Sequence, residues 1–247
     1  MRYFIELAYR GTEYRGWQRQ PGVPTVQLAL EDGLRQVLGY PVSTWCCGRT
    51  DAGVHADQFF VQFDTDHPVP ENAVTNLANA LPPDIAVYRI FEVPKDNAHH
   101  VQRSAIARTY EYHWHRQPHP FRHLGSTYLR RSAGIDINAM QAAARLIPNY
   151  EDFRGFCKVP EKHNHTRCDI HAARIERGEG DQFYFSITAN RFLRGMIRLL
   201  AAQLLDVGMG KMTVEDFDAL LAAGERPPHF NFAPPEGLHL VRVRYGF

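Results

Sequence analysis

The chain has 247 residues, of which 44% are hydrophobic and 22% charged, and its formal net charge is +1. This composition is typical of a globular protein that buries a substantial core, as one large domain or two smaller ones. No apolar run is long enough to span a membrane, and the opening stretch MRYFIELAYR has the pattern of a strand rather than of a secretion signal. Four cysteines do not make a disulfide framework, so we expect a reducing, cytoplasmic setting.

The first part of the chain predicts the order β-α-β-β-α-β. Apolar residues alternate in the predicted strands and recur at helical spacing in the predicted helices, with Thr25 as an N-cap and Gly39 at a helix end. The strands are expected at residues 3–9, 42–47, 58–64 and 85–93, and the helices at 25–39 and 71–81. This order indicates a split β-α-β plan, with helices on one side of an antiparallel sheet.

The second part contains similar elements. Strands are expected at residues 108–115, 170–176, 183–189 and 238–245, and helices around Met140, from Asn190 to Val207, and after a capping pair formed by Thr213 and Asp216. We therefore expect an α+β protein with two similar halves joined near residues 94–104. Residues 1–98 form the N-terminal half and residues 99–247 the C-terminal half.

Two segments of the chain are basic although the whole protein is nearly neutral. No Asp or Glu occurs between Glu111 and Asp136 or between Asp181 and Asp206. The arginines of these segments are Arg116, Arg122, Arg130 and Arg131, followed by Arg191, Arg194 and Arg198. The last three would share one face of the predicted helix, where like charges repel, so we expect an anionic partner such as phosphates or a carboxylate. The alternative for either segment is a solvated face balanced by acids elsewhere.

The strand that begins at Arg108 places Tyr110, Tyr112 and Trp114 on the same face as this arginine. Aromatic rings near arginines suit a stacked base beside a phosphate. The alternative is a sheet face packed by a helix, which we favour for Tyr112 and Trp114.

The stretch GRTDAGVHA, residues 48–56, holds the single acid Asp51 between Gly48 and Gly53. Gly, Thr and Asp are common turn formers, so a simple turn is one interpretation.

A group of cysteines and histidines has side chains of the types that bind zinc: Cys157, His163, His165, Cys168 and His171. Its spacing gives neither a C-x-x-C knuckle nor a helical H-x-x-x-H pair, and we expect no metal site.

Five motifs follow one another along the chain: GWQRQPGVPTVQLALE, GRTDAGVHA, ARTYEY, ANRFLRGMIR and APPEGLHLVRVRY. Together they resemble those of the bacterial tRNA pseudouridine synthase A family, and the resemblance extends from about residue 3 to residue 245. The resemblance implies two ferredoxin-like halves that share a continuous antiparallel sheet with a central cleft. It also implies a homodimer that acts on tRNA, isomerises uridines 38, 39 and 40 of the anticodon stem-loop, and needs no cofactor or metal.

The resemblance also assigns residues. Asp51 occupies the position of the family's nucleophile, and Tyr110 that of a tyrosine that stacks on the target base and is a candidate for proton transfer at C5. Arg198 occupies the position of the basic residue that pairs with the aspartate, and Arg49 that of an arginine that helps to extrude the base. We expect Arg108, Arg191 and Arg194 to contact the substrate. The family often continues after the motif histidine with a small residue and Gly-Gln, whereas this chain reads Ala56-Asp57-Gln58-Phe59.

Two rival functions remain at this level. One is a non-catalytic RNA-binding module, which would place aromatic residues on the sheet face but gives no reason for Asp51 in its glycine-bounded loop. The other is a metal-dependent hydrolase that uses His163, His165 and Cys168.

Overall fold

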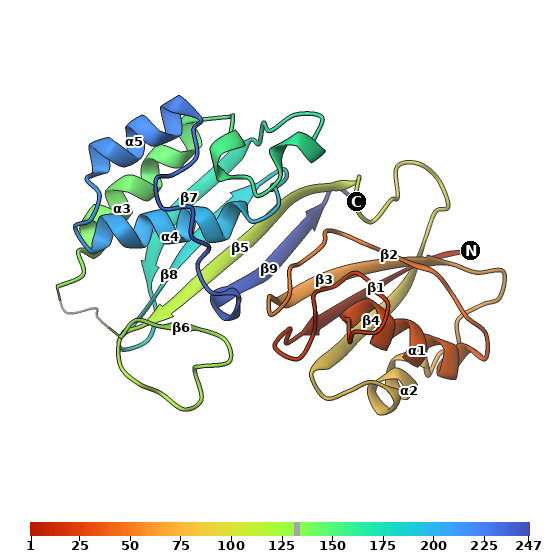
Figure 1. Cartoon of the computed structure of the whole chain (residues 1–247). Coiled ribbons are helices and arrows are strands. Elements are labelled where there is room, and N and C mark those ends of the chain that lie inside the picture. Colours follow the sequence, from red (N-terminus) through yellow and green to blue (C-terminus); the bar gives the residue numbers. More distant parts are fainter. Residues whose placement is uncertain (131–133) are drawn as a thin grey trace. The chain divides into compact units, whose positions relative to one another are not determined.

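The computed structural model describes residues 1–130 and 134–247 (Figure 1). Arg131, which we predicted to belong to a basic segment, lies outside the described residues. The chain divides into two compact units, Met1–Ile106 with Leu240–Phe247, and Ala107–His239. The division follows Ile106 rather than residue 98, and the last eight residues belong to the first unit.

The first unit is built on antiparallel strands in the order β4-β1-β3, with a short strand β2 beside β3. Their bounds are Arg2–Tyr9 for β1, Thr44–Cys46 for β2, His55–Asp64 for β3 and Ile85–Val93 for β4. Ile5 pairs with both Val61 and Ile90, and all three lie in the middle of their strands. Helices α1 (Val26–Leu38) and α2 (Ala73–Ala80) pack against each other, and α2 also packs against β4.

The ends of α1 follow from its sequence. The Thr25 hydroxyl oxygen accepts a hydrogen bond from Leu28 N–H (3.4 Å), which satisfies one of the donors left open at a helix start. Gly39 ends the helix in the left-handed conformation, with φ of 82°, which glycine adopts without strain. Both predicted ends of this helix are confirmed.

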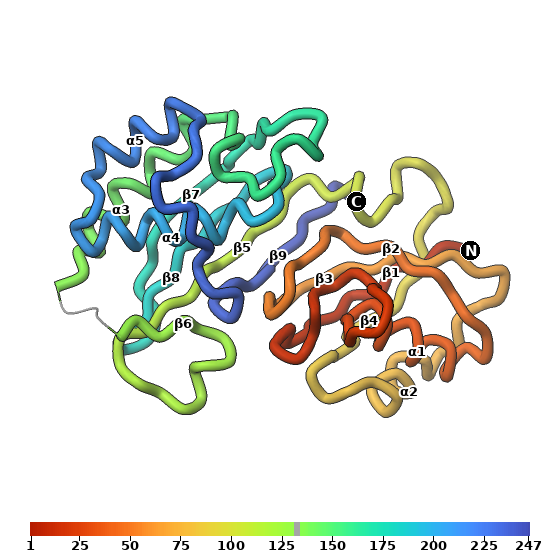
Figure 2. Tube along the Cα trace, in the orientation of Figure 1, coloured from red at the N-terminus to blue at the C-terminus, as the bar shows by residue number. Residues whose placement is uncertain are grey.

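The second unit contains antiparallel strands in the order β5-β8-β7, which are Ala105–His115, Gln182–Ala189 and Ile170–Arg177. The two-residue strand β6, Thr127–Tyr128, pairs with β5 in parallel. Helices α3 (Ile137–Leu146), α4 (Met196–Gly208) and α5 (Val214–Ala223) pack together, and α3 also packs against β7. The tube in Figure 2 follows α4 and α5 into the extended stretch that leads to the last strand, β9 (Leu238–Tyr245). The chain is therefore an α+β protein with mostly antiparallel strands.

The prediction of one helix from Asn190 to Val207 is wrong at its start. Helix α4 begins at Met196, after Gly195, whose φ of 76° lies in the left-handed region that interrupts a right-handed helix. A Cβ at Gly195 would lie 2.5 Å from Cε1 of Phe232, so the close approach of that ring also requires glycine here. Arg191 and Arg194 therefore precede the helix, and the predicted stripe of three arginines does not form.

The core of the second unit contains the aromatic residues that we expected there. Tyr112 and Trp114 are fully buried, and the Trp114 ring stacks on Phe183 at 5.2 Å between centroids. The Tyr112 hydroxyl donates to the Pro234 carbonyl oxygen (2.7 Å) and lies 2.8 Å from the Thr127 hydroxyl. Burial raises the pKa of Tyr112, so this hydroxyl stays protonated as a structural donor.

No helix in the described ranges is both long and apolar enough to cross a membrane.

We expect Trp114→Ala to destabilise the protein by about 3–5 kcal/mol, because it removes a fully buried ring and leaves a cavity. Thermal unfolding followed by circular dichroism measures this as a melting temperature lowered by several degrees. Trp45→Ala is the matched control, since Trp45 is 47% exposed and its loss should change the melting temperature little. Equal effects of the two substitutions would contradict the packing described here.

Candidate active site

Asp51 lies in the connection between β2 and β3, which we call the Asp51 loop (residues 47–54). Val54 N–H donates to the Asp51 carbonyl oxygen (3.2 Å), which closes a turn over residues 51–54. Gly53 occupies the third position of this turn with φ of 78°, a conformation that side chains with a Cβ rarely adopt. The simple-turn interpretation is therefore correct for the main chain, and the half-buried Asp51 carboxyl is carried at the start of the turn.

A second segment, residues 9–17, holds the Asp51 loop in place, and we call it the clamp segment. Trp17 N–H donates to the Thr50 carbonyl oxygen (3.2 Å), and Gly53 N–H donates to the Tyr14 carbonyl oxygen (3.3 Å). The Tyr9 and Thr50 hydroxyl oxygens lie 2.7 Å apart. These contacts fall on both sides of Asp51, so its main chain is fixed from either direction.

The clamp segment is itself anchored in the core of the first unit. Trp17 is 2% exposed and packs against Phe59 of β3, with 4.5 Å between ring centroids. The Tyr9 ring contacts Phe59 as well, edge-on at 5.2 Å. The motif that contains GWQRQ does not indicate this supporting role, because the contacts join residues more than thirty positions apart in the sequence.

The predicted site residues are divided between the two units. Asp51 and the exposed Arg49 belong to the first unit, and Arg108, Tyr110, Arg191, Arg194 and Arg198 to the second.

On β5, Arg108 and Tyr110 both contact the segment that precedes α4. Arg108 Nη1 donates to the carbonyl oxygen of Asn190 (2.8 Å). Tyr110 is 7% exposed, and its ring meets Phe192 edge-on at 5.2 Å. Tyr110 is thus held by packing, so its ring is fixed in orientation.

Arg198 is the third residue of α4, in the first turn of the helix. The positive end of a helix dipole lies there, and a cation at that end is unfavourable by a few tenths of a kcal/mol or more. The first turn contains no acidic residue to offset this. The guanidinium is nevertheless held firmly, because Nε donates to the Ala233 carbonyl oxygen (2.6 Å) and Cζ lies 5.5 Å from the centre of the Phe232 ring. Helix stability alone therefore does not account for a cation at this position.

The other arginines have different surroundings. Arg191 contacts the His165 ring, with Nη1 3.1 Å from Nε2. Burial, followed by the charge of Arg191, lowers the pKa of the neighbouring His163. Arg194 is exposed. Arg122, in the first basic segment, pairs with Asp181 at 2.6 Å, so its charge is already compensated.

The histidine and cysteine cluster does not assemble a metal site. Within residues 1–130 and 134–247, no group of three or more His, Cys, Asp or Glu side chains is arranged to hold a metal ion. Burial raises the pKa of the Cys168 thiol to about 11, which keeps it protonated at neutral pH, whereas a metal ligand must be a thiolate.

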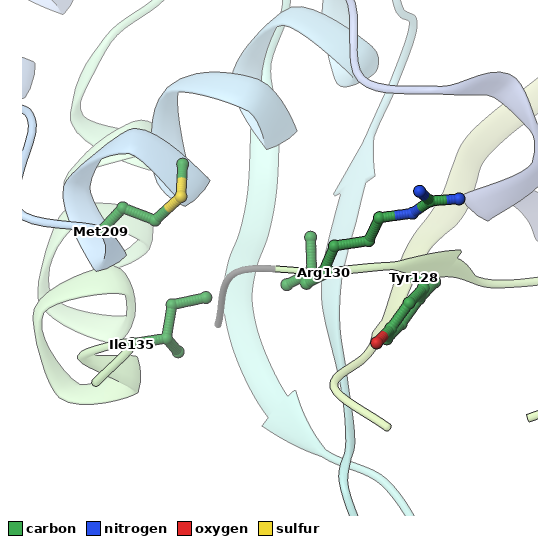
Figure 3. Close-up of a pocket in the computed structure, with 5 residues that line it drawn as sticks. Tyr128, Arg130, Ile135 and Met209 are labelled. Carbon is green, nitrogen blue, oxygen red and sulfur yellow. The ribbon is translucent and has the colours of Figure 1, made fainter. Parts of the chain in front are cut away.

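A cavity of about 310 Å³ lies elsewhere in the second unit, as Figure 3 shows. Its walls come from β6 and the residues after it, from the residue two positions before α3 and from the residue just after α4, which are Tyr128, Leu129, Arg130, Ile135 and Met209. None of the predicted site residues lines it.

Among known protein families, a model described as tRNA pseudouridine synthase matches residues 150–246 of this chain. Three similar proteins are each named tRNA pseudouridine synthase A. The protein from Porphyromonas gingivalis is 38% identical over 99% of this chain and 97% of its own length. The protein from Bacteroides thetaiotaomicron is 40% identical over 99% of this chain and 90% of its own length. The protein from Chlorobaculum tepidum is 38% identical over 98% of this chain and 96% of its own length. Full-length similarity at this level places the chain in the tRNA pseudouridine synthase A family.

Proposed function

We propose that this protein isomerises uridine to pseudouridine in tRNA, at positions 38, 39 and 40 of the anticodon stem-loop, with Asp51 as the nucleophile. The observation that carries the proposal is the Asp51 loop, whose main chain is hydrogen-bonded to the clamp segment on both sides of the half-buried Asp51. Membership of the family and the names of the relatives support the reaction type.

The reaction exchanges one bond of the nucleoside for another. The bond between C1′ of the ribose and N1 of the uracil breaks, the uracil turns, and a bond between C1′ and C5 forms. The proton on C5 is then lost and N1 gains one, so the product is an isomer of the substrate. An Asp51 carboxylate that adds to the sugar or to the base, and leaves again at the end, accounts for this exchange without a cofactor.

Asp51 must be ionised to attack, and a carboxylate in a site that excludes water needs a nearby cation to offset the loss of solvation. We assign this role to the guanidinium of Arg198 or Arg49. We favour Arg198 for this role because it lies in the first turn of α4, where the helix dipole does not stabilise a cation.

The target uridine has to leave the base stack before it can react. Arg49, exposed two residues before Asp51, is the proposed wedge that helps to extrude it. Tyr110 is the proposed stacking partner and the candidate for proton transfer at C5, while Arg108, Arg191 and Arg194 contact the RNA. A homodimer of ferredoxin-like halves that share a sheet and a central cleft completes the proposal, and it rests on the family resemblance.

Mapping pseudouridine by mass spectrometry in an unmodified tRNA transcript, after incubation with the purified protein, tests the function. We expect new pseudouridine at positions 38, 39 or 40 wherever the transcript has uridine there. Treatment with a chelator should leave the yield unchanged, whereas a metal-dependent hydrolase would lose its activity. Pseudouridine that forms only at other positions would disprove the assigned sites.

We expect Asp51→Asn to abolish product while leaving tRNA affinity and the melting temperature nearly unchanged, because the amide has the same shape but is no nucleophile. Product is measured by the same mapping, and affinity by filter binding. Asp32→Asn is the matched control, since Asp32 is a carboxylate on the exposed surface of α1 and should retain full activity. Turnover by Asp51→Asn, with deamidation excluded, would refute the assignment.

For Tyr110 we expect that substitution by Phe preserves tRNA binding but removes most of the turnover, since the ring remains and only the hydroxyl is lost. Because Tyr110 is buried, Tyr110→Ala should also lower stability, so Tyr110→Phe is the cleaner test. Single-turnover rates with saturating enzyme separate chemistry from binding. A Tyr110→Phe variant with the wild-type rate would exclude the hydroxyl from proton transfer.

A further inference from the structure

Phe121 is more exposed than any other large hydrophobic side chain in the described part of the chain, at 89%. It lies in the connection between β5 and β6, which we call the Phe121 loop (residues 116–125). In Figure 1 this connection extends away from the strands of its own unit. The other exposed large hydrophobic residues, such as Tyr88 at 58%, have about half of their surface covered.

The tip of the Phe121 loop is built from two consecutive turns. Arg122 N–H donates to the His119 carbonyl oxygen (3.2 Å), and Gly125 N–H donates to the Arg122 carbonyl oxygen (3.0 Å). Pro120 occupies the second position of the first turn, where its fixed φ favours the turn, and Phe121 the third. His123 Nδ1 donates to the Pro120 carbonyl oxygen (2.6 Å), which ties the two turns together.

Asp181 holds the base of the loop. One of its carboxylate oxygens accepts hydrogen bonds from Arg116 N–H (2.7 Å) and Gln117 N–H (2.6 Å). The other pairs with Arg122 Nη1 at 2.6 Å. At the far end, His239 Nε2 donates to the Gly125 carbonyl oxygen (2.8 Å). The ring of Phe121 is therefore presented by an ordered loop, which reduces the entropy lost when it binds a partner.

The charge around the ring indicates the chemistry of that partner. The sequence contains no acid from residue 112 to residue 135, and Arg116, His119, His123 and Arg130 are exposed near the ring in sequence. If Phe121 lay on a two-fold axis, two loops with the same exposed arginine would meet, which disfavours a second copy of this chain on that axis. An exposed aromatic ring in a segment that has exposed arginines and no acids suits an RNA segment, with a base on the ring and phosphates beside it.

We infer that Phe121 stacks on an unpaired base of the tRNA, outside the reacting uridine, and that Asp181 positions the loop for this contact. The inference deepens the proposed function and rests on it for the identity of the RNA. Phe121 thus contributes to binding rather than to chemistry. Its loss should weaken tRNA affinity and raise KM, while kcat stays the same.

The test measures the affinity of an unmodified tRNA transcript for the whole protein by fluorescence anisotropy, together with KM and kcat for pseudouridine formation. We expect Phe121→Ala to weaken binding by about 5- to 150-fold, the range of a lost base stack, with kcat and the melting temperature unchanged. Phe121→Trp should bind like the wild type, because it retains a ring. Tyr88→Ala, which removes an exposed aromatic from β4 of the other unit, is the matched control and should bind normally.

An unchanged affinity in Phe121→Ala would overturn the inference, as would a loss of the same size in Tyr88→Ala. Sedimentation velocity measures the oligomeric state of the wild type and of Phe121→Ala. A wild-type dimer that dissociates in Phe121→Ala would place the ring between two copies of the chain and would also overturn the inference. Because anisotropy reports bound tRNA whether or not its uridines are isomerised, the affinity comparison does not depend on turnover. A wild-type protein that binds tRNA but forms no pseudouridine would refute the proposed function, while weaker binding by Phe121→Ala would still support the stacked base.

Discussion

The geometry around Asp51 depends on a contact between two stretches of main chain that leaves no room for a side chain. A Cβ on Gly11 would lie 2.0 Å from the Val54 carbonyl oxygen, and one on Gly16, whose φ is 94°, would lie 2.8 Å from the Thr50 carbonyl oxygen. Only glycine lets the clamp segment come this close. The main chain around the proposed nucleophile is therefore positioned by hydrogen bonds from the clamp segment.

In the second unit, contacts with the side chain itself hold a proposed site residue in place. Arg198 is placed in the first turn of α4, where the helix dipole disfavours a cation, yet a carbonyl oxygen and an aromatic ring fix its guanidinium. Departures from what local stability favours are expected at functional sites, where other contacts offset them. The same reasoning applies to Phe121, whose exposed ring contributes nothing to the core although ordered turns hold its loop.

Most elements of this fold could be predicted from local signals, such as the cap at Thr25, the pair formed by Thr213 and Asp216, and the alternation along β5. The start of α4 could not, because the left-handed conformation of Gly195 goes together with a Phe232 ring that arrives from almost forty residues later. Alternation places Tyr110, Tyr112 and Trp114 on one face but does not rank them. For the candidate site, the motif around Asp51 predicts which residue is the nucleophile, whereas the clamp segment that holds its loop makes contacts between residues distant in the sequence, which no motif indicates.

The basic segments show why counting charges in a sequence overestimates the contacts available to phosphate. Arg122, in the first of these segments, is compensated by Asp181. Each phosphate contact adds roughly one unit to the slope of log affinity against log salt, and only arginines that face the RNA contribute. Asp181 thus has two effects. It neutralises the charge of Arg122, which is then not available to a phosphate, and it fixes the loop that presents Phe121. A protein with a net charge of +1 can in this way use ordered aromatic and cationic groups locally, without a strongly basic surface overall.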